Sequence, residues 1–514
     1  MRTTLIRQLT VILTVLSILL VSSCKKDDPV DDVNDNDDTT VYFEGTLEDA
    51  LADLDSVYIY LLTKIYDGWC SPLLAANLMS GDAIKGGDSD GDQYKFLELQ
   101  QFDADAGNEV CYSLWMKYYL GIYHTNKILF NTSVHDIAGN EQMRGEALFF
   151  RAYFHFELLK LFKNIPVVNQ YLPDHSYINT GLDLAGKCDL IVADLLQAAE
   201  LLPLKSSLSP EDLFRPSKGA AQALLGKLYL YMASDYFNLG SSYYTDALAQ
   251  FDEVINSGEY ALMDDFGDNF IKTGEFEEES VFEISYYANE STSQDWTPAS
   301  TGNIDCQFNG PKMLYGNSVY DEGWGFQRVK EELTDMFMNE DDAVRRSATV
   351  ITLDEVLESG GTYNFENDEI LGYPTNFNNK TTTKITEQES SPSDTYHYGT
   401  NDRIIRYSDV LLMAAEANLK IGNDPLAQTY LNEVRGRVDL DPVSATGAAL
   451  FTAIKTERRL ELALEGHRFF DLVRWGDADE IFAEEGFTEG VNEILPIPVS
   501  ELIEHPELEQ NPGY

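Results

Sequence analysis

Positive charge is scarce in this sequence. Its 514 residues include 36 Lys and Arg but 87 Asp and Glu, which gives a formal net charge of −51 at pH 7. Because nucleic-acid binding requires clustered cations that contact phosphates, we expect no nucleic-acid partner. A strongly acidic surface instead suits a neutral ligand, a cationic ligand, or solubility outside the cell.

Cysteines are few and scattered. The five are Cys24, Cys70, Cys111, Cys188 and Cys306. They form no CxxC pair and show no metal-ligand spacing, so the sequence predicts no cysteine-based metal site. For the last four, two alternatives stay open, namely disulfide bonds or buried free thiols.

Catalytic signatures are missing or lack their scaffold. There is no Walker loop, no HExxH and no GxGxxG followed by an acidic residue. Residues 87–91 formally fit G-x-S-x-G, but no strand precedes them and no apolar helix follows. Acidic residues are so numerous that a catalytic carboxylate pair cannot be recognised by inspection. We therefore expect no catalytic residues, and the alternative function is a surface-anchored glycoside hydrolase.

One apolar run, residues 11–21, is too short to span a bilayer as a helix. Arg2 and Arg7 precede it, which is the pattern of a signal peptide over residues 1–23. Val-Ser-Ser before Cys24 resembles the bacterial lipobox, so we predict lipidation of Cys24 and a membrane anchor there. Residues 24–44 are acidic and without apolar periodicity, which predicts a disordered tether.

Helical periodicity dominates the remaining chain. We predict helices over residues 47–66, 109–130, 141–162, 184–202, 217–237, 244–257, 403–421 and 425–438. A long surface loop is expected at residues 71–105, and an irregular region with one strand, residues 280–287, at 258–400. Two prolines in an apolar run, Pro496 and Pro498, predict an extended C-terminal segment.

The predicted fold class is mainly α, with a few short strands. Small residues on one helix and large ones on the next suggest tetratricopeptide-like helix pairs, although no clean fixed period is present. We expect a helical region at 45–257 and a second region at 258–514, with loops to 400, helices over 401–476 and an extended end. Residues 45–514 are expected to form one compact unit.

Residues 454–476 mix apolar and charged positions at helical spacing. We predict a single central helix whose charges pair with one another as they are buried. The alternative is a catalytic cluster on Glu461, Glu465 and His467.

Six stretches carry recognisable motifs in a fixed order. They are RGEALFFRAYF from Arg144, RPSKGAA from Arg215, RYSDVLLMAAEA from Arg406, ERRLELALEGHRFFDLVRWG from Glu457, PIP from Pro496 and NPGY from Asn511. Together they resemble the SusD/RagB family of outer-membrane nutrient-uptake lipoproteins. Lys-Lys-Asp-Asp after Cys24 also resembles the signal that exports such lipoproteins to the outer leaflet.

This resemblance implies a helical scaffold that binds an oligosaccharide, or in some members a peptide, and performs no chemistry. It also implies a location on the outer membrane, facing outward, and a SusC-like TonB-dependent transporter as partner. The motif residues are then structural. They are Arg144, Glu146, Arg151, Arg406, Glu416, Glu457, Arg458, Glu461, Glu465, Arg468, Asp471 and Arg474.

A glycan site needs flat aromatic faces flanked by polar groups. The irregular region and the early loop contain such residues, and family members place their aromatic platform on the corresponding segments. The residues that we expect to bind ligand are Trp296, Trp324, Tyr94, Tyr286, Tyr320 and Asn303. For each of them, the alternative is packing in the core or anchoring a loop.

Asp88, Asp90 and Asp92 alternate along the early loop, a spacing that can wrap Ca²⁺. Gln93 and Leu99 stand where an EF-hand would have glycine and glutamate, so that motif does not fit. Calcium is therefore a candidate structural ion, and a solvated acidic loop is the alternative. No other cofactor is expected.

Overall fold

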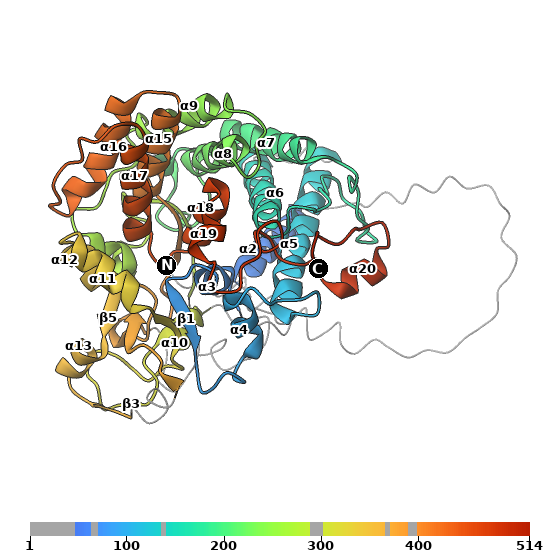
Figure 1. Ribbon diagram of the computed structural model, residues 1–514. Helices are drawn as coiled ribbons and strands as arrows, with labels where there is room; N and C mark the ends of the chain where they lie inside the picture. The colour runs from blue at the N-terminus through green and yellow to red at the C-terminus, as the bar shows by residue number, and fades with distance from the viewer. Residues whose placement is uncertain (1–46, 63–69, 135–139, 288–301, 365–370, 389–397) are drawn as a thin grey trace, which may run out of the picture.

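Helices make up most of this structure, a computed structural model that describes residues 47–62, 70–134, 140–287, 302–364, 371–388 and 398–514 (Figure 1). The strands are few and short. The predicted fold class, mainly α with a few short strands, is confirmed. Within the described ranges, no helix is long and apolar enough to cross a membrane. The signal peptide, Cys24 and the tether lie outside the described residues.

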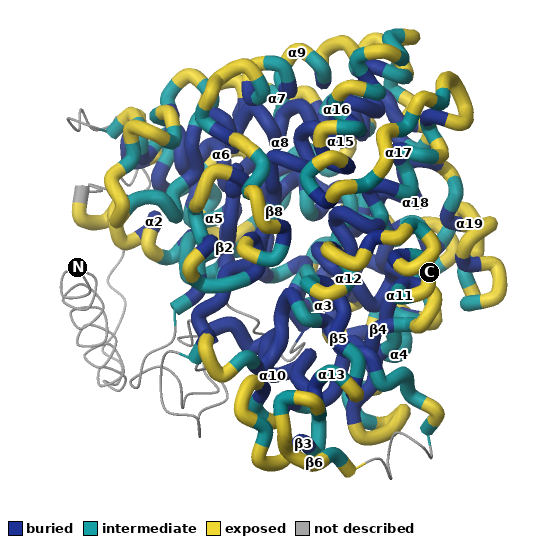
Figure 2. The backbone as a smooth tube through the Cα atoms, turned by 90° about the vertical axis from the view of Figure 1, so that its left-hand side faces the viewer, coloured by how far each residue is buried: buried dark blue, intermediate teal, exposed yellow. Residues whose placement is uncertain are grey.

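The first half of the chain contributes a succession of long helices, each packed on the next. They are α2 (Leu47–Leu62), α5 (Glu109–Val134), α6 (Asn140–Phe162), α7 (Leu184–Leu201), α8 (Lys218–Ala233) and α9 (Tyr243–Ile255). α6 and α8 are buried along nearly their whole length (Figure 2). Small residues permit this packing, because a Cβ at Gly226 of α8 would overlap the ring of Phe251 on α9. The tetratricopeptide likeness of these pairs stays a prediction.

A second group of helices, from the C-terminal part of the chain, packs against the first group. It consists of α15 (Tyr407–Lys420), α16 (Asp424–Arg437), α17 (Gly447–Glu461), α18 (Arg468–Trp475) and α19 (Ala478–Ile481). α15 packs on α16 and α17 and also on α9 and α8, so segments far apart in the sequence lie side by side (Figure 1). The C-terminal segment through Pro496 and Pro498, which we predict to be extended, is neither helix nor strand, and α20 (Val499–Glu504) follows it.

Among the described residues, the strands form four two-stranded antiparallel sheets. Each joins distant segments: β1 (Ala83–Gly86) with β4 (Phe326–Val329), β2 (Ser280–Ile284) with β8 (Asp402–Arg406), β3 (Leu314–Tyr315) with β6 (Thr362–Tyr363), and β5 (Val350–Thr352) with β7 (Asn376–Asn378). Short helices accompany them: α3 (Pro72–Leu78), α4 (Tyr94–Gln100), α10 (Asp305–Asn309), α11 (Glu331–Asn339), α12 (Ala343–Thr349) and α13 (Leu353–Glu358). Single 3₁₀ turns occur at Lys205–Ser207, Phe266–Phe270, Lys272–Gly274 and Ile385–Glu387.

Residues 71–105 and the helix predicted from residue 403 are among the segments that differ from the structure. Residues 71–105 are not one long loop, because Ser71 caps α3 by accepting a hydrogen bond from the Leu74 amide, and β1 and α4 follow. The helix predicted from residue 403 begins four residues later. Residues before it form β8, because β2 offers them a strand partner.

The helix predicted over residues 454–476 is two helices. α17 ends at Glu461, and α18 begins at Arg468 after a turn in which Leu464 and Gly466 have φ values of 63° and 79°. The Asn77 side chain holds this turn, since it donates to the Leu464 carbonyl at 2.8 Å and accepts from the Gly466 amide at 3.0 Å. It thus replaces bonds that a continuous helix would make to itself.

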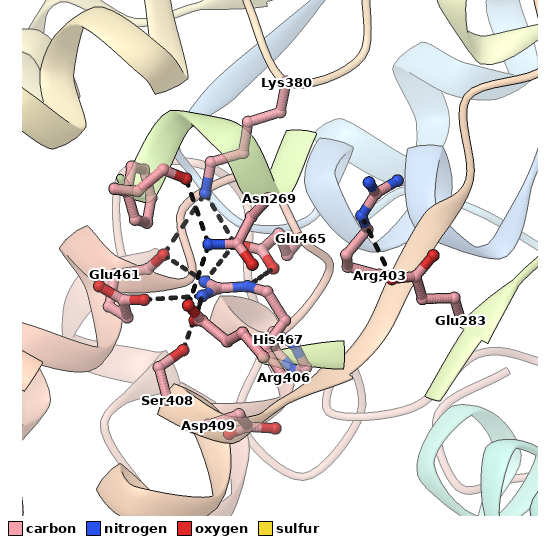
Figure 3. Close-up of polar contacts among 12 residues, drawn as sticks. Asn269, Glu283, Lys380, Arg403, Arg406, Ser408, Asp409, Glu461, Glu465 and His467 are labelled. Carbon is pink, nitrogen blue, oxygen red and sulfur yellow. Dashed lines mark hydrogen bonds and ion pairs between the residues drawn. The ribbon is translucent and has the colours of Figure 1, made fainter. Parts of the chain in front are cut away.

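Arg406 lies at the centre of a buried ionic network (Figure 3). Its guanidinium contacts Glu279 at 2.5 Å, Glu461 at 2.7 Å and Glu465 at 2.8 Å. The carboxylates of the network are Glu279, Asp342, Glu457, Glu461 and Glu465, and its cations are Arg345, Lys380, Arg406, Arg435 and Arg437. Charge is balanced, which is the condition for burying ions without a large penalty.

A second network surrounds α18. Arg458 contacts Asp409 at 2.8 Å and Asp471 at 2.9 Å, and Arg474 contacts Glu416 at 2.5 Å. These predicted structural residues therefore pair as expected. His467 lies among them, and burial first, then the nearby Lys227, lowers its pKa to about 3. A neutral imidazole in a cationic surrounding fits a packing role.

The remaining predicted structural residues lie on α6 and at the turn after α17. Arg151 pairs with Asp194 at 2.6 Å, and Glu146 pairs with Arg215 at 2.9 Å. Arg144 donates to the Thr132 hydroxyl at 3.0 Å. Arg468 is 3.5 Å from Asp82, which is also held by another arginine. Cys70, Cys111, Cys188 and Cys306 are all buried, and Cys111 and Cys188 are free thiols.

Removing Glu461 should destabilise the protein strongly. Glu461→Ala leaves Arg406, Arg437 and Arg345 short of a carboxylate inside the core, at a cost of roughly 3–5 kcal/mol in the free energy of unfolding. Urea unfolding measures this loss.

Arg468→Ala is the comparison variant. Asp82 keeps its ion pair with Arg459 at 2.6 Å in this variant, so we expect the free energy of unfolding to fall by only roughly 1–3 kcal/mol. An effect of Arg468→Ala as large as that of Glu461→Ala would contradict this account of the network.

Acid should weaken the fold through the same residues. Burial alone would raise the pKa of Glu461, but Arg437, Arg406 and Arg345 lower it well below the usual value, and Arg406 and Lys380 lower that of Glu465 against burial. Glutamate in the unfolded chain has a pKa of about 4.3. The contribution of both residues to stability is therefore complete above that pH and is lost as the pH falls through their folded pKa values.

Glu461→Gln removes one of these titrations. The variant should show a shallower fall in unfolding free energy between about pH 5 and pH 3 than the wild type, measured by urea unfolding across that series. Equal slopes would show that the network does not control acid stability.

Candidate functional site

The β1–β4 pair joins the early loop to the middle of the chain. Gly86 is paired with Phe326, and the Gly87 amide donates to the Gly325 carbonyl at 2.9 Å. Gly86 has a φ of 72°, and a Cβ there would overlap the carbonyl oxygen of Gly325, so only glycine fits. We call residues 86–94 and 310–326 the β1–β4 loop pair.

Three aromatic residues predicted to bind ligand lie on this loop pair, namely Tyr94, Trp324 and the buried Tyr320. Tyr94 is the first residue of α4 and is 57% exposed. Trp324 is half-buried, and its ring packs edge-on against Phe308 with 4.9 Å between centroids. Phe96 packs on both Phe308 and Phe326, so the two segments share one aromatic base. That base fixes both segments and leaves the Tyr94 ring accessible.

A lysine holds the acidic loop together from inside. Lys85 Nζ donates to the carbonyls of Ser89 and Asp92, both at 2.5 Å. The Asp88 amide donates to the Asp92 carboxylate at 2.9 Å, and Asp88 itself pairs with Lys312. Burial lowers the pKa of Lys85 and raises that of Asp92.

The calcium prediction gains no support from this geometry. Among the residues that the structure describes, no three His, Cys, Asp or Glu side chains converge on a point where a metal ion could bind. Carbonyl oxygens that could ligate a cation are directed at the ammonium group of Lys85. Calcium at Asp88, Asp90 and Asp92 therefore stays an untested prediction.

Three of the predicted ligand-binding residues are buried. Tyr286 and Asn303 both donate to the Asp402 carboxylate, each at 3.0 Å, and are 3% and 0% exposed. Tyr320 packs in a small apolar cluster and donates to Asn379 at 3.2 Å. Their surroundings are those of core residues, which was the alternative for each of them. Trp296 lies outside the described residues.

Lys85 and Lys312 were missed by the sequence reasoning. Single lysines have no periodicity or motif that marks them. The usable signal was the dense run of aspartates from Asp88 to Asp92, because so many carboxylates on a short loop require nearby cations. The arrangement offers an aromatic face beside charged and amide groups, which can stack against a sugar ring and bind its hydroxyls.

Two family models match this chain. The model of the SusD family matches residues 278–486, a span that contains Trp324 and most of the ionic network. The model described as starch-binding associating with outer membrane matches residues 77–230, which contain Tyr94 and the acidic loop. One segment of the β1–β4 loop pair thus lies in each matched span.

Solved structures and a curated relative agree with these matches. A laminarin binding SusD-like protein is 30% identical, with a TM-score of 0.78 over 92% of this chain and 100% of that chain. Surface glycan-binding protein A from Bacteroides thetaiotaomicron, in complex with laminarihexaose, is 25% identical, with a TM-score of 0.78 over 91% and 100%. SusD-like protein P2 of Formosa agariphila is 26% identical over 513 residues, 92% of this chain and 94% of that protein.

These likenesses extend over almost the whole length of both chains in each comparison. The two matched spans, residues 77–230 and 278–486, contain most of the long helices of this chain, its ionic network around Arg406 and its β1–β4 loop pair. The chain belongs to the SusD/RagB family.

Proposed function

We propose that this chain is an outer-membrane lipoprotein that binds an oligosaccharide on the β1–β4 loop pair. The observation that supports the proposal is that the β1–β4 pairing and the contacts of Phe96 with Phe308 and Phe326 join the segment of Tyr94 to the segment of Trp324. Likeness to a laminarin binding protein at 30% identity supports a glycan as the ligand and makes laminarin the first to test.

Binding on this surface needs no reaction. A sugar ring stacks its apolar face on an aromatic side chain, and its hydroxyls exchange hydrogen bonds with nearby charged and amide groups. The rigid base under Trp324 lowers the ordering cost of binding, because the ring is already held against Phe308. The protein would then release its ligand unchanged.

Delivery to a SusC-like TonB-dependent transporter is the second part of the proposal. The lipobox-like sequence before Cys24 would tether the protein to the membrane, and the tether after it would let the folded part reach a partner. The family model described as associating with the outer membrane supports this location, and we propose that the protein faces outside the cell.

Tyr94→Ala and Trp324→Ala should each weaken binding of laminarihexaose. Each removes one stacking face, which should raise the dissociation constant roughly tenfold by calorimetric titration. Phe130→Ala is the matched control, because Phe130 is an exposed aromatic on α5 and is not part of the loop pair. Unchanged affinity in both site variants, with the fold retained, would show that the loop pair is not the site.

The purified protein should bind a glycan without cutting it. We expect a raised melting temperature with the cognate oligosaccharide from a panel, because a ligand that binds only the folded state stabilises it. Reducing ends assayed on the same samples should not increase. Release of reducing ends at catalytic rates would support the glycoside hydrolase alternative, and stabilisation by peptides alone would replace glycan with peptide.

A further inference from the structure

A cavity of about 370 Å³ lies between α5, residues 168–177 and α20. α20 lies beside α5 near the C-terminus in Figure 1, and the β1–β4 loop pair contributes none of the lining residues. The volume falls within the range of about 300–1,000 Å³ that is usual for small-molecule pockets. The cavity therefore has room for a ligand of its own.

Aromatic rings form the walls of this cavity. Tyr119 and Tyr177 are 4.8 Å apart between ring centroids, Tyr123 stacks on His175 at 4.1 Å, and His505 lies 4.4 Å from Tyr177. Hydrogen bonds fix two of these rings. Trp115 Nε1 donates to the Tyr177 hydroxyl at 2.8 Å, and the Tyr119 hydroxyl donates to the Pro166 carbonyl at 2.8 Å. The walls are thus ordered before any ligand enters.

The charge of the cavity lining is negative. Asp174, Glu501 and Glu504 line it, and no Lys or Arg is among the lining residues. Lys127, one turn along α5 from Tyr123, is paired with Asp53 at 3.0 Å and does not line the cavity. In a chain of net charge −51, such a lining attracts cations and repels anions.

Of the three carboxylates that line the cavity, Glu501 is the buried one. It is 5% exposed and accepts a hydrogen bond from the neutral Tyr177 hydroxyl at 2.7 Å. Across the described ranges, no Lys or Arg forms an ion pair with it. A buried carboxylate without a cation is costly, and a ligand ammonium group placed here would offset that cost.

We propose that this cavity binds an amino sugar with a free amine. The ammonium group would pair with Glu501, and the tyrosine faces would take the apolar face of the ring together with cation–π contact to the ammonium. A sugar is favoured over a slender alkylammonium chain because aromatic side chains line a cavity of about 370 Å³. This site is separate from the β1–β4 loop pair.

Calorimetric titration of the full chain with glucosamine, N-acetylglucosamine and glucose tests the proposal. At mildly acidic pH, where the amine is protonated, glucosamine should bind roughly tenfold or more tightly than the other two sugars, as a hydrogen-bonded charge pair predicts. Equal affinity for all three would overturn the proposal. Tighter binding of Nα-acetyl-lysine N-methylamide than of glucosamine would also overturn it and would indicate a peptide site.

Glu501→Gln keeps the size and the acceptor for Tyr177 but removes the charge, so it should abolish the preference for glucosamine. Tyr123→Ala removes one ring face and provides a second readout if Glu501→Gln does not fold. Glu509→Gln, an exposed carboxylate on the same C-terminal segment, should bind as the wild type does. Unchanged glucosamine affinity in both pocket variants would overturn the proposal.

Discussion

The guanidinium group of Arg406 is the interaction on which this structure depends. It is 1% exposed, and it joins the end of β8 to Glu279 before β2, to Glu461 at the end of α17 and to Glu465 in the following turn. Planar bidentate geometry allows one side chain to fix several carboxylates at once. Lys380 follows β7 and forms an ion pair with the same Glu465. The long helices and the loop-rich region are therefore held by one charge-balanced centre.

The ligand contacts that we propose lie away from that centre, on segments that the scaffold positions. The family motifs are concentrated in the buried charges, whereas Tyr94, at the start of α4, and Trp324, just before β4, take no part in either ionic network. The scaffold residues therefore identify the fold but do not identify the ligand. The aromatic cavity beside α20 shows the same separation, since its buried carboxylate, Glu501, takes no part in either ionic network.

Local pattern was sufficient for the long helices, because their apolar spacing and end signals are contained within each segment. Local pattern failed where a residue far away in the sequence determines the local structure. Asn77 breaks the helix around Leu464, although nearly 390 residues separate them, and β2 draws residues 402–406 out of the next helix. Tyr286 and Asn303 have the composition of a binding site, but Asp402 binds both inside the core. Composition alone carries no information about such partners.

The pairing of β1 with β4 has a consequence for how the protein forms. Ala83 is matched with Val329, so a large part of the chain must be present before this contact can close. Closing so long a loop is entropically costly and slow compared with forming neighbouring helices. The helices can assemble first and the loop pair afterwards, which makes the ligand-facing surface one of the last parts of the molecule to be completed during folding.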